Sequence, residues 1–175
     1  MHPLQDLIVF DPDGRSVRLG DTWAERTAAL VFVRHFGCLF CRQQIGELAP
    51  FLPRIRQAGA ELFVIGNGSI DEARAFRDDQ QLAMPLLTDP TRAAYGALDM
   101  RRGLGSMLRL PVFARSLGAL RGGFRQARVA GDWRQQGGVV VIAPGGVERY
   151  RYVSRFAGDH PSPEVIVEAG LNAVT

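Results

Sequence analysis

The sequence predicts an α/β domain built on a mixed central sheet with helices on both faces. Short apolar segments rich in β-branched and aromatic residues alternate with segments in which apolar residues recur every three or four positions. This alternation is typical of strands joined by helices. Near the C-terminus, two apolar segments are separated only by Pro144-Gly145-Gly146, a turn sequence that predicts a hairpin.

Five strands are predicted before residue 90. Residues 7–10 and 17–19 flank Asp11-Pro12-Asp13-Gly14, whose turn chemistry indicates a short hairpin. Apolar segments at 28–34, 62–66 and 84–87 predict buried strands. Residues 138–143 and 148–153 add the C-terminal hairpin.

Helices are predicted between these strands. The 3-4-3 spacing of Ile45, Leu48, Leu52 and Ile55 predicts a helix over 41–58, kinked by its two prolines. We also expect helices over 71–81, starting near Asp71, over 91–98, and over 163–171, with Pro163 in the first turn.

The overall composition is that of a soluble globular protein. The 175 residues fit one ordinary domain, 46% of them are hydrophobic and 22% are charged, which argues against disorder. No apolar segment approaches the roughly 20 residues that cross a bilayer, and the N-terminus lacks the pattern of a secretory signal. We therefore expect a single domain over 1–175, located in the cytoplasm.

The chemistry is predicted to lie at the only two cysteines, Cys38 and Cys41. They are too close to staple a fold, and they stand where a buried strand leads into a helix. Free N–H groups and the helix dipole at that position favour a thiolate, and Arg34 and Arg42 flank it with positive charge. We expect Cys38 to be the nucleophile, with a pKa below neutral and below that of Cys41, and Cys41 to resolve the oxidised form.

Two other interpretations of the cysteines are open. Both side chains could serve packing alone, as buried cysteines often do. A structural zinc ion normally needs four ligands, and besides the cysteines the chain has only His2, His35 and His160, with no second C-x-x-C motif. We therefore expect no metal.

Two separated motifs resemble a known family. The sequence Phe-Val-Arg-His-Phe-Gly-Cys-Leu-Phe-Cys-Arg at 32–42 is similar to the active-site signature of peroxiredoxin-like 2 proteins. These form a branch of the alkyl hydroperoxide reductase/thiol-specific antioxidant superfamily. Residues 131–133, 136–139 and 158–161 resemble the end of the same family, including its prostamide/prostaglandin F synthase members.

The resemblance implies a thioredoxin-like three-layer sandwich and an antioxidant or reductase activity without a cofactor. It implies thioredoxin or a similar dithiol as electron donor, and a small peroxide, lipid or disulfide as substrate. A homodimer is one option for the oligomeric state.

The chain departs from ordinary peroxiredoxins around the reactive cysteine. Those enzymes have a threonine three residues and a proline seven residues before it, where this chain has His35 and Val31. They also have an arginine before the penultimate strand, where this chain has Gly137. We expect His35, Gly137 and Gly138 to contact the substrate, the glycines by letting a substrate or the chain backbone approach Cys38 closely. A bulge or loop is the alternative for the glycines. Gly158-Asp159-His160 is expected to form a turn that caps the last helix, with binding of a ligand as the alternative.

A basic helical insertion is predicted over about 101–128. This segment has seven arginines and no acidic residue, and Leu110, Phe113, Leu117, Leu120 and Phe124 recur at helical spacing. It could be a lid that attracts a carboxylate or a lipid peroxide, a contact for an acidic protein or membrane surface, or an insertion with solvated arginines. Membrane contact is not expected, and without a recognition motif neither is nucleic acid.

The sequence thus supports two functions. The first is a thiol oxidoreductase that uses Cys38 and Cys41 and is recharged by an external dithiol. The second is a non-catalytic redox-sensing or partner-binding protein, which the missing peroxiredoxin residues keep open.

Overall fold

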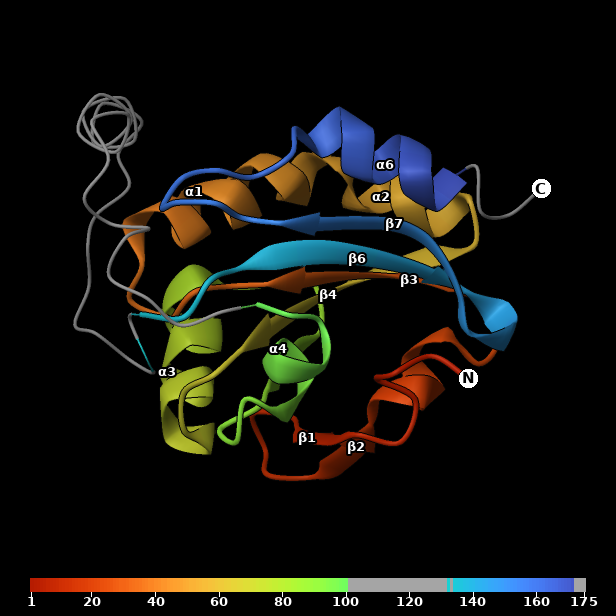
Figure 1. Ribbon diagram of the computed structural model, residues 1–175. Coiled ribbons are helices and arrows are strands. Elements are labelled where there is room, and N and C mark those ends of the chain that lie inside the picture. Colours follow the sequence, from red (N-terminus) through yellow and green to blue (C-terminus); the bar gives the residue numbers. More distant parts are fainter. Residues whose placement is uncertain (101–131, 133, 172–175) are drawn as a thin grey trace.

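The computed structural model describes residues 1–100, 132 and 134–171, and the predicted mixed sheet lies at its centre (Figure 1). Within these residues seven strands form one sheet in the order β2-β1-β5-β4-β3-β6-β7. Their bounds are β1 (Ile8–Phe10), β2 (Ser16–Arg18), β3 (Thr27–Phe32), β4 (Ala60–Gly66), β5 (Leu86–Thr88), β6 (Gly138–Ala143) and β7 (Val147–Val153).

Strand directions confirm that the sheet is mixed. β3 pairs with β4, and β4 with β5, in parallel. β6 runs antiparallel to β3, and β7 antiparallel to β6. Every residue of β3 and β6 is buried, as expected for strands covered on both faces.

Helices cover both faces of the sheet, which gives the predicted three layers. Their bounds are α1 (Leu39–Leu48), α2 (Leu52–Gln57), α3 (Ile70–Gln80), α4 (Ala93–Ala97) and α6 (Pro163–Leu171). α1, α2 and α6 lie along one face of the central strands and α4 lies against the other (Figure 1). Alternate residues of β3 separate the two cores: Val31 packs with Ile45 and Ile166 in one, and Leu30 with Tyr95 in the other.

The predicted helix over 41–58 is broken in the middle, as its prolines indicate. α1 ends at Leu48, the 3-10 turn η2 (Ala49–Phe51) contains Pro50, and α2 contains Pro53 near its start. The helix begins at Leu39, two residues earlier than predicted. This earlier start places Cys38 at the N-cap and Cys41 in the first turn.

α3 also begins differently from the prediction. Its N-cap is Ser69, whose side chain accepts a hydrogen bond from the N–H of Glu72 while the Glu72 carboxylate accepts one from the N–H of Ser69. This capping box, rather than Asp71, determines where the helix starts.

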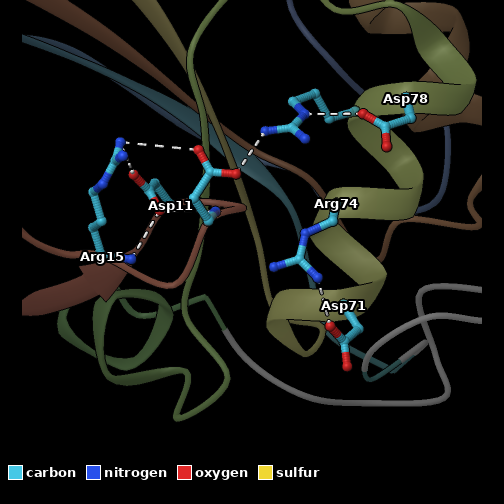
Figure 2. A network of polar contacts seen from close by, with 7 residues as sticks. Asp11, Arg15, Asp71, Arg74 and Asp78 are labelled. Carbon is cyan, nitrogen blue, oxygen red and sulfur yellow. Dashed lines mark hydrogen bonds and ion pairs between the residues drawn. The ribbon is translucent and has the colours of Figure 1, made fainter.

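In a group of exposed ion pairs, the pair between Arg77 and Asp13 connects the turn between β1 and β2 to α3 (Figure 2). Arg77 of α3 lies 3.3 Å from Asp13 in the turn and 3.0 Å from Asp78, and Arg15 lies 3.8 Å from Asp11. Exposed pairs of this kind contribute little to stability. The effect of the pair between Arg77 and Asp13 is to attach the N-terminal hairpin to the helix beside it.

The predicted basic helix over 101–128 lies outside the described residues. Among the helices that the structure does describe, none has both the length and the apolar character needed to span a bilayer.

Candidate active site

Cys38 occupies the turn between β3 and α1. Its backbone is extended (φ −72°, ψ 121°), its N–H donates to the carbonyl of His35 (3.1 Å), and its carbonyl accepts from the N–H of Arg42 (3.1 Å). The sulfur makes no regular capping hydrogen bond, but the N–H groups of Phe40 and Cys41 stabilise its charged form. Cys38 therefore lies at the positive end of α1, where a thiolate is favoured.

The structure has no disulfide between the two cysteines, and each is only 5% exposed. A hydrogen bond from the Cys41 thiol, helped by the two N–H groups and the charge of Arg34, lowers the pKa of Cys38 to about 7, although burial opposes the shift. Burial and the bond to Cys38 raise the pKa of Cys41. The predicted asymmetry is present, but the pKa of Cys38 lies at neutral pH rather than below it.

The two arginines that flank the pair occupy different environments. Arg34 is buried, its N–H donates to Cys41 Sγ (3.3 Å), and its positive charge lowers the pKa of Cys38. Arg42 instead pairs with Asp79 of α3 (2.6 Å), and its guanidinium lies 5.6 Å from the centre of the Phe76 ring.

The expectation that Arg42 stabilises the thiolate stays a prediction, and the ion pair between Arg42 and Asp79 argues against it. Arg42 is not among the groups that lower the pKa of Cys38. It follows Cys41 on the helix and projects toward α3, so its charge is used to join α1 to α3.

We expect strongly selective alkylation of the pair. At pH 7, substoichiometric iodoacetamide should label Cys38 at least about tenfold faster than Cys41, and the rate should increase with pH through a midpoint near the Cys38 pKa of about 7. Arg42→Gln should leave that midpoint unchanged. Peptide mapping by mass spectrometry gives both rates; equal labelling, or a midpoint near the free-thiol value of about 8.5, would contradict the assignment.

His35 is buried beside Cys38 and is held neutral. It is 6% exposed, and burial, together with the charge of Arg34, lowers its pKa to about 4 despite the opposing effect of Asp132. Its Nδ1 atom is buried and has no hydrogen-bond partner. A neutral imidazole with an unused ring nitrogen is compatible with the predicted contact to a substrate, which stays a prediction.

The lowered pKa of His35 predicts acid sensitivity. Between pH 6.5 and 4 the unfolded chain binds a proton at His35 and the folded protein does not, so stability falls as the pH falls through this range. We expect the free energy of unfolding to drop by about 2 kcal/mol from pH 7 to pH 5 because of this residue. Urea titrations at both pH values should show a smaller drop in His35→Gln; an equal drop in the two proteins would refute the assignment.

Close contacts within the chain explain why positions 137 and 138 are glycines. A Cβ atom on Gly137 would lie 2.6 Å from the carbonyl oxygen of Phe32, and one on Gly138 would lie 2.4 Å from that of Tyr152. Either a substrate or the chain backbone was expected to come close to these glycines, and the observed close contacts are with the chain backbone. A contact between these glycines and a substrate remains a prediction.

A cavity of about 20 Å³, enough for one water molecule, lies against Cys41. Its lining includes Arg34, Gln44, Gly137 and Asp159. The carboxylate of Asp159 accepts hydrogen bonds from the Tyr152 hydroxyl (2.7 Å) and the Arg155 N–H (2.8 Å). The predicted turn at Gly158 is present, and the Asp159 carboxylate is bonded to the end of β7 and the loop that follows. A cap of α6 by this segment stays a prediction.

Two residues that sequence analysis missed hold the chain next to the cysteines. The side-chain amide of Asn67 donates to the carbonyl of Arg34 (2.9 Å) and accepts from the N–H of Asp132 (2.8 Å). The hydroxyl of Tyr95 lies 2.8 Å from the carbonyl oxygen of Val33. Asn67 is a polar residue directly after a buried strand, and this position could have indicated its role from the sequence. Nothing in the sequence distinguished Tyr95. Among the described residues, no three side chains of the His, Cys, Asp or Glu type gather as a metal site would require.

Comparison with known proteins connects this site to a family. A sequence model described as AhpC/TSA antioxidant enzyme matches residues 47–155. The chain is 31% identical to the chloroplastic thioredoxin-like protein AAED1 of Arabidopsis thaliana, over 95% of this chain and 71% of that protein. It is 32% identical to mouse peroxiredoxin-like 2C, over 97% and 80%, and 28% identical to the prostamide/prostaglandin F synthase of Pongo abelii, over 91% and 83%.

Solved structures show the same fold. The bacterioferritin comigratory protein of Xanthomonas campestris superposes with a TM-score of 0.71 at 14% identity, covering 98% of this chain and 94% of that one. Peroxidoxin BcpB of Mycobacterium tuberculosis gives 0.68 at 14% identity, covering 96% and 90%. Together, the thioredoxin-like fold and the relatives define the protein as a thiol oxidoreductase of peroxiredoxin-like type. More particularly, the chain belongs to the AhpC/TSA antioxidant enzyme family and is related to its peroxiredoxin-like 2 members.

Proposed function

We propose that this protein reduces a peroxide or a disulfide-like substrate through Cys38 and Cys41 and is recharged by an external dithiol. The observation that carries the proposal is the placement of both cysteines at the start of α1, with Cys38 at the N-cap and Cys41 in the first turn. The Cys41 thiol donates to Cys38 Sγ, so the pKa of one cysteine falls to about 7 while that of the other rises. A nucleophile and a protonated partner thus stand side by side.

In the first step the Cys38 thiolate attacks the substrate. With a hydroperoxide, its sulfur forms an S–O bond as the O–O bond breaks, and the leaving alkoxide takes up a proton to become an alcohol. Cys38 is oxidised to a sulfenic acid and the peroxide is reduced. With a disulfide, the same attack gives a mixed disulfide and releases a thiol.

In the second step Cys41 attacks the oxidised Cys38. The new S–S bond displaces water from the sulfenic acid, or the second thiol from a mixed disulfide. Cys38 and Cys41 lie within one helical turn of each other at the start of α1, so closure requires only a local rearrangement. A dithiol of the thioredoxin type then restores both thiols by exchange.

A coupled assay tests this proposal. NADPH oxidation through thioredoxin reductase and thioredoxin is measured with hydrogen peroxide, an organic hydroperoxide, a lipid hydroperoxide and a small disulfide as separate substrates. We expect donor-dependent turnover of at least one, and a Cys38–Cys41 disulfide detectable by mass spectrometry after one equivalent of oxidant. If no substrate is consumed faster than by free cysteine, the catalytic proposal is wrong.

A redox sensor is the second candidate, supported by the burial of both sulfurs and by the departures at His35, Val31 and Gly137. A sensor would form the disulfide once and change its contacts with a partner. Disulfide formation without turnover in the coupled assay would identify this function.

A further inference from the structure

Tyr95 of α4 reaches the end of β3 from the face of the sheet opposite α1. Its side chain is fully buried, and its ring packs edge-on against Phe32, with 5.1 Å between the ring centres. Its hydroxyl lies 2.8 Å from the carbonyl oxygen of Val33 and 2.9 Å from that of Ile65, so one proton is shared between the ends of β3 and β4. The hydroxyl is therefore fixed at the point where the chain leaves the sheet toward Cys38.

The carbonyl that Tyr95 contacts belongs to the same peptide group as the N–H that reaches Cys41. The Val33 carbonyl and the Arg34 N–H form one planar unit, and this N–H donates to Cys41 Sγ at 3.3 Å. A hydrogen bond to the carbonyl polarises the unit and strengthens the N–H as a donor. A continuous hydrogen-bonded path thus runs from the Tyr95 hydroxyl to the Cys41 sulfur.

The surrounding contacts hold this peptide in place. The N–H of Val33 donates to the carbonyl of Ile65 (2.8 Å), and the carbonyl of Arg34 accepts from the Asn67 side chain (2.9 Å). Both neighbouring peptides are therefore bonded to β4 or to the loop after it, which restricts rotation of the Val33–Arg34 peptide. Tyr95 adds a hydrogen bond to the carbonyl of this peptide.

We propose that Tyr95 is a positioning residue for Cys41, acting through the Val33–Arg34 peptide to orient the hydrogen bond that stabilises the Cys41 sulfur as it becomes negatively charged. The inference rests on the proposed function, in which Cys41 attacks the oxidised Cys38. In that step Cys41 loses its proton, an S–S bond forms, the S–O bond of the sulfenic acid breaks, and the departing hydroxide takes up a proton to give water. The Cys41 sulfur is oxidised and the sulfenic sulfur is reduced.

Such help is needed at Cys41 more than at Cys38. Burial raises the pKa of the Cys41 thiol, and the Arg34 N–H opposes that effect. Tyr95 touches neither the sulfur nor a substrate, so its removal should slow the attack by Cys41 and leave the initial oxidation of Cys38 unchanged.

Tyr95→Phe tests the proposal, because it removes the hydroxyl and keeps the ring. Sulfenic acid is generated with one equivalent of peroxide, and closure of the disulfide is followed by quenching and mass spectrometry. Closure should be about three- to tenfold slower than in the wild type, while oxidation of Cys38 keeps its rate. Thr22→Val is the matched control, since it removes another buried hydroxyl that donates to a backbone carbonyl, that of Leu19 (2.8 Å), and it should change neither rate.

A second measurement does not depend on peroxide chemistry. In a Cys38→Ser background, the pH dependence of Cys41 alkylation should move to higher pH when Tyr95→Phe is added. Incorporating 3-fluorotyrosine at position 95, which retains the ring and is a stronger donor, should move it to lower pH and provides a test should the phenylalanine variant fold poorly.

The two proposals fail in distinguishable ways. If no variant forms a disulfide but the alkylation shifts remain, the proposed function is wrong and the link between Tyr95 and Cys41 stands. If closure and alkylation are the same in Tyr95→Phe as in the wild type, or if Thr22→Val causes equal changes, the positioning role of Tyr95 is wrong.

Discussion

Replacing Cys38 by serine is expected to lower kcat/KM for any substrate by at least about 10³-fold, because a serine hydroxyl is not ionised near neutral pH. The contacts that favour the charged sulfur in the wild type, from the Cys41 thiol and two backbone N–H groups, cannot supply an anion at serine. The measurement is the coupled assay with the best substrate found for the wild type. Full turnover by Cys38→Ser would overturn the assignment of the nucleophile.

Cys41→Ser is the informative companion because it separates the two steps. It retains Cys38 at the N-cap of α1 and replaces the Cys41 thiol by a hydroxyl that can still donate a hydrogen bond, so one equivalent of oxidant should still react. Sulfenic acid should then accumulate, trapped by dimedone, and turnover with the dithiol donor should fall sharply. The opposite pattern, with Cys41→Ser inert to oxidant and Cys38→Ser reactive, would exchange the two roles.

Gly138→Ala is expected to destabilise the protein by about 3 kcal/mol. The added Cβ would lie 2.4 Å from the carbonyl oxygen of Tyr152 and 2.6 Å from Cε of Met100. The methionine side chain can move, but the Tyr152 carbonyl belongs to β7 in the antiparallel pair with β6, so the strands themselves must separate. Urea unfolding at pH 7 provides the measurement.

Gly96→Ala is the matched control. Gly96 is exposed in α4, and the position that an added methyl group would occupy has no neighbouring atom within 4 Å, so alanine should stabilise the helix by about 0.5–1 kcal/mol. If Gly138→Ala instead has unchanged stability but loses activity, the predicted contact between Gly138 and a substrate regains support over the packing explanation.

The assignment of the cysteines depends on geometry rather than on the match to the family model. The matching segment, 47–155, begins after both cysteines, and the solved structures share only about 14% identity and so show the fold alone. What points to Cys38 and Cys41 is their place at the start of α1 and the opposite shifts of their pKa values.

Local patterns in the sequence were sufficient for the elements that present the site. An apolar strand shortly before Cys38 and a helical periodicity after it predicted the strand, the helix that follows it and the location of the thiols. Pro50 and Pro53 predicted the break after Leu48. The capping box from Ser69 to Glu72 was also readable and would have corrected the start of α3. Such features depend on neighbours within a few residues, so they are encoded locally.

Only the tertiary structure decided which distant groups meet at the site. Arg42 looked like a partner of Cys38, but it pairs with Asp79, 37 residues further along the chain. Gly138 looked like an opening for substrate, but the carbonyl of Tyr152 on the next strand is what requires a glycine. Tyr95 lies 62 residues from Val33 in the sequence. Its sequence pattern resembles that of other buried helical residues, and its contact with Val33 exists only because α4 packs against the sheet. Periodicity specifies the face on which a residue lies, whereas its partner depends on how strands and helices pack, and that packing determined the charge, the space and the hydrogen bonds around the two cysteines.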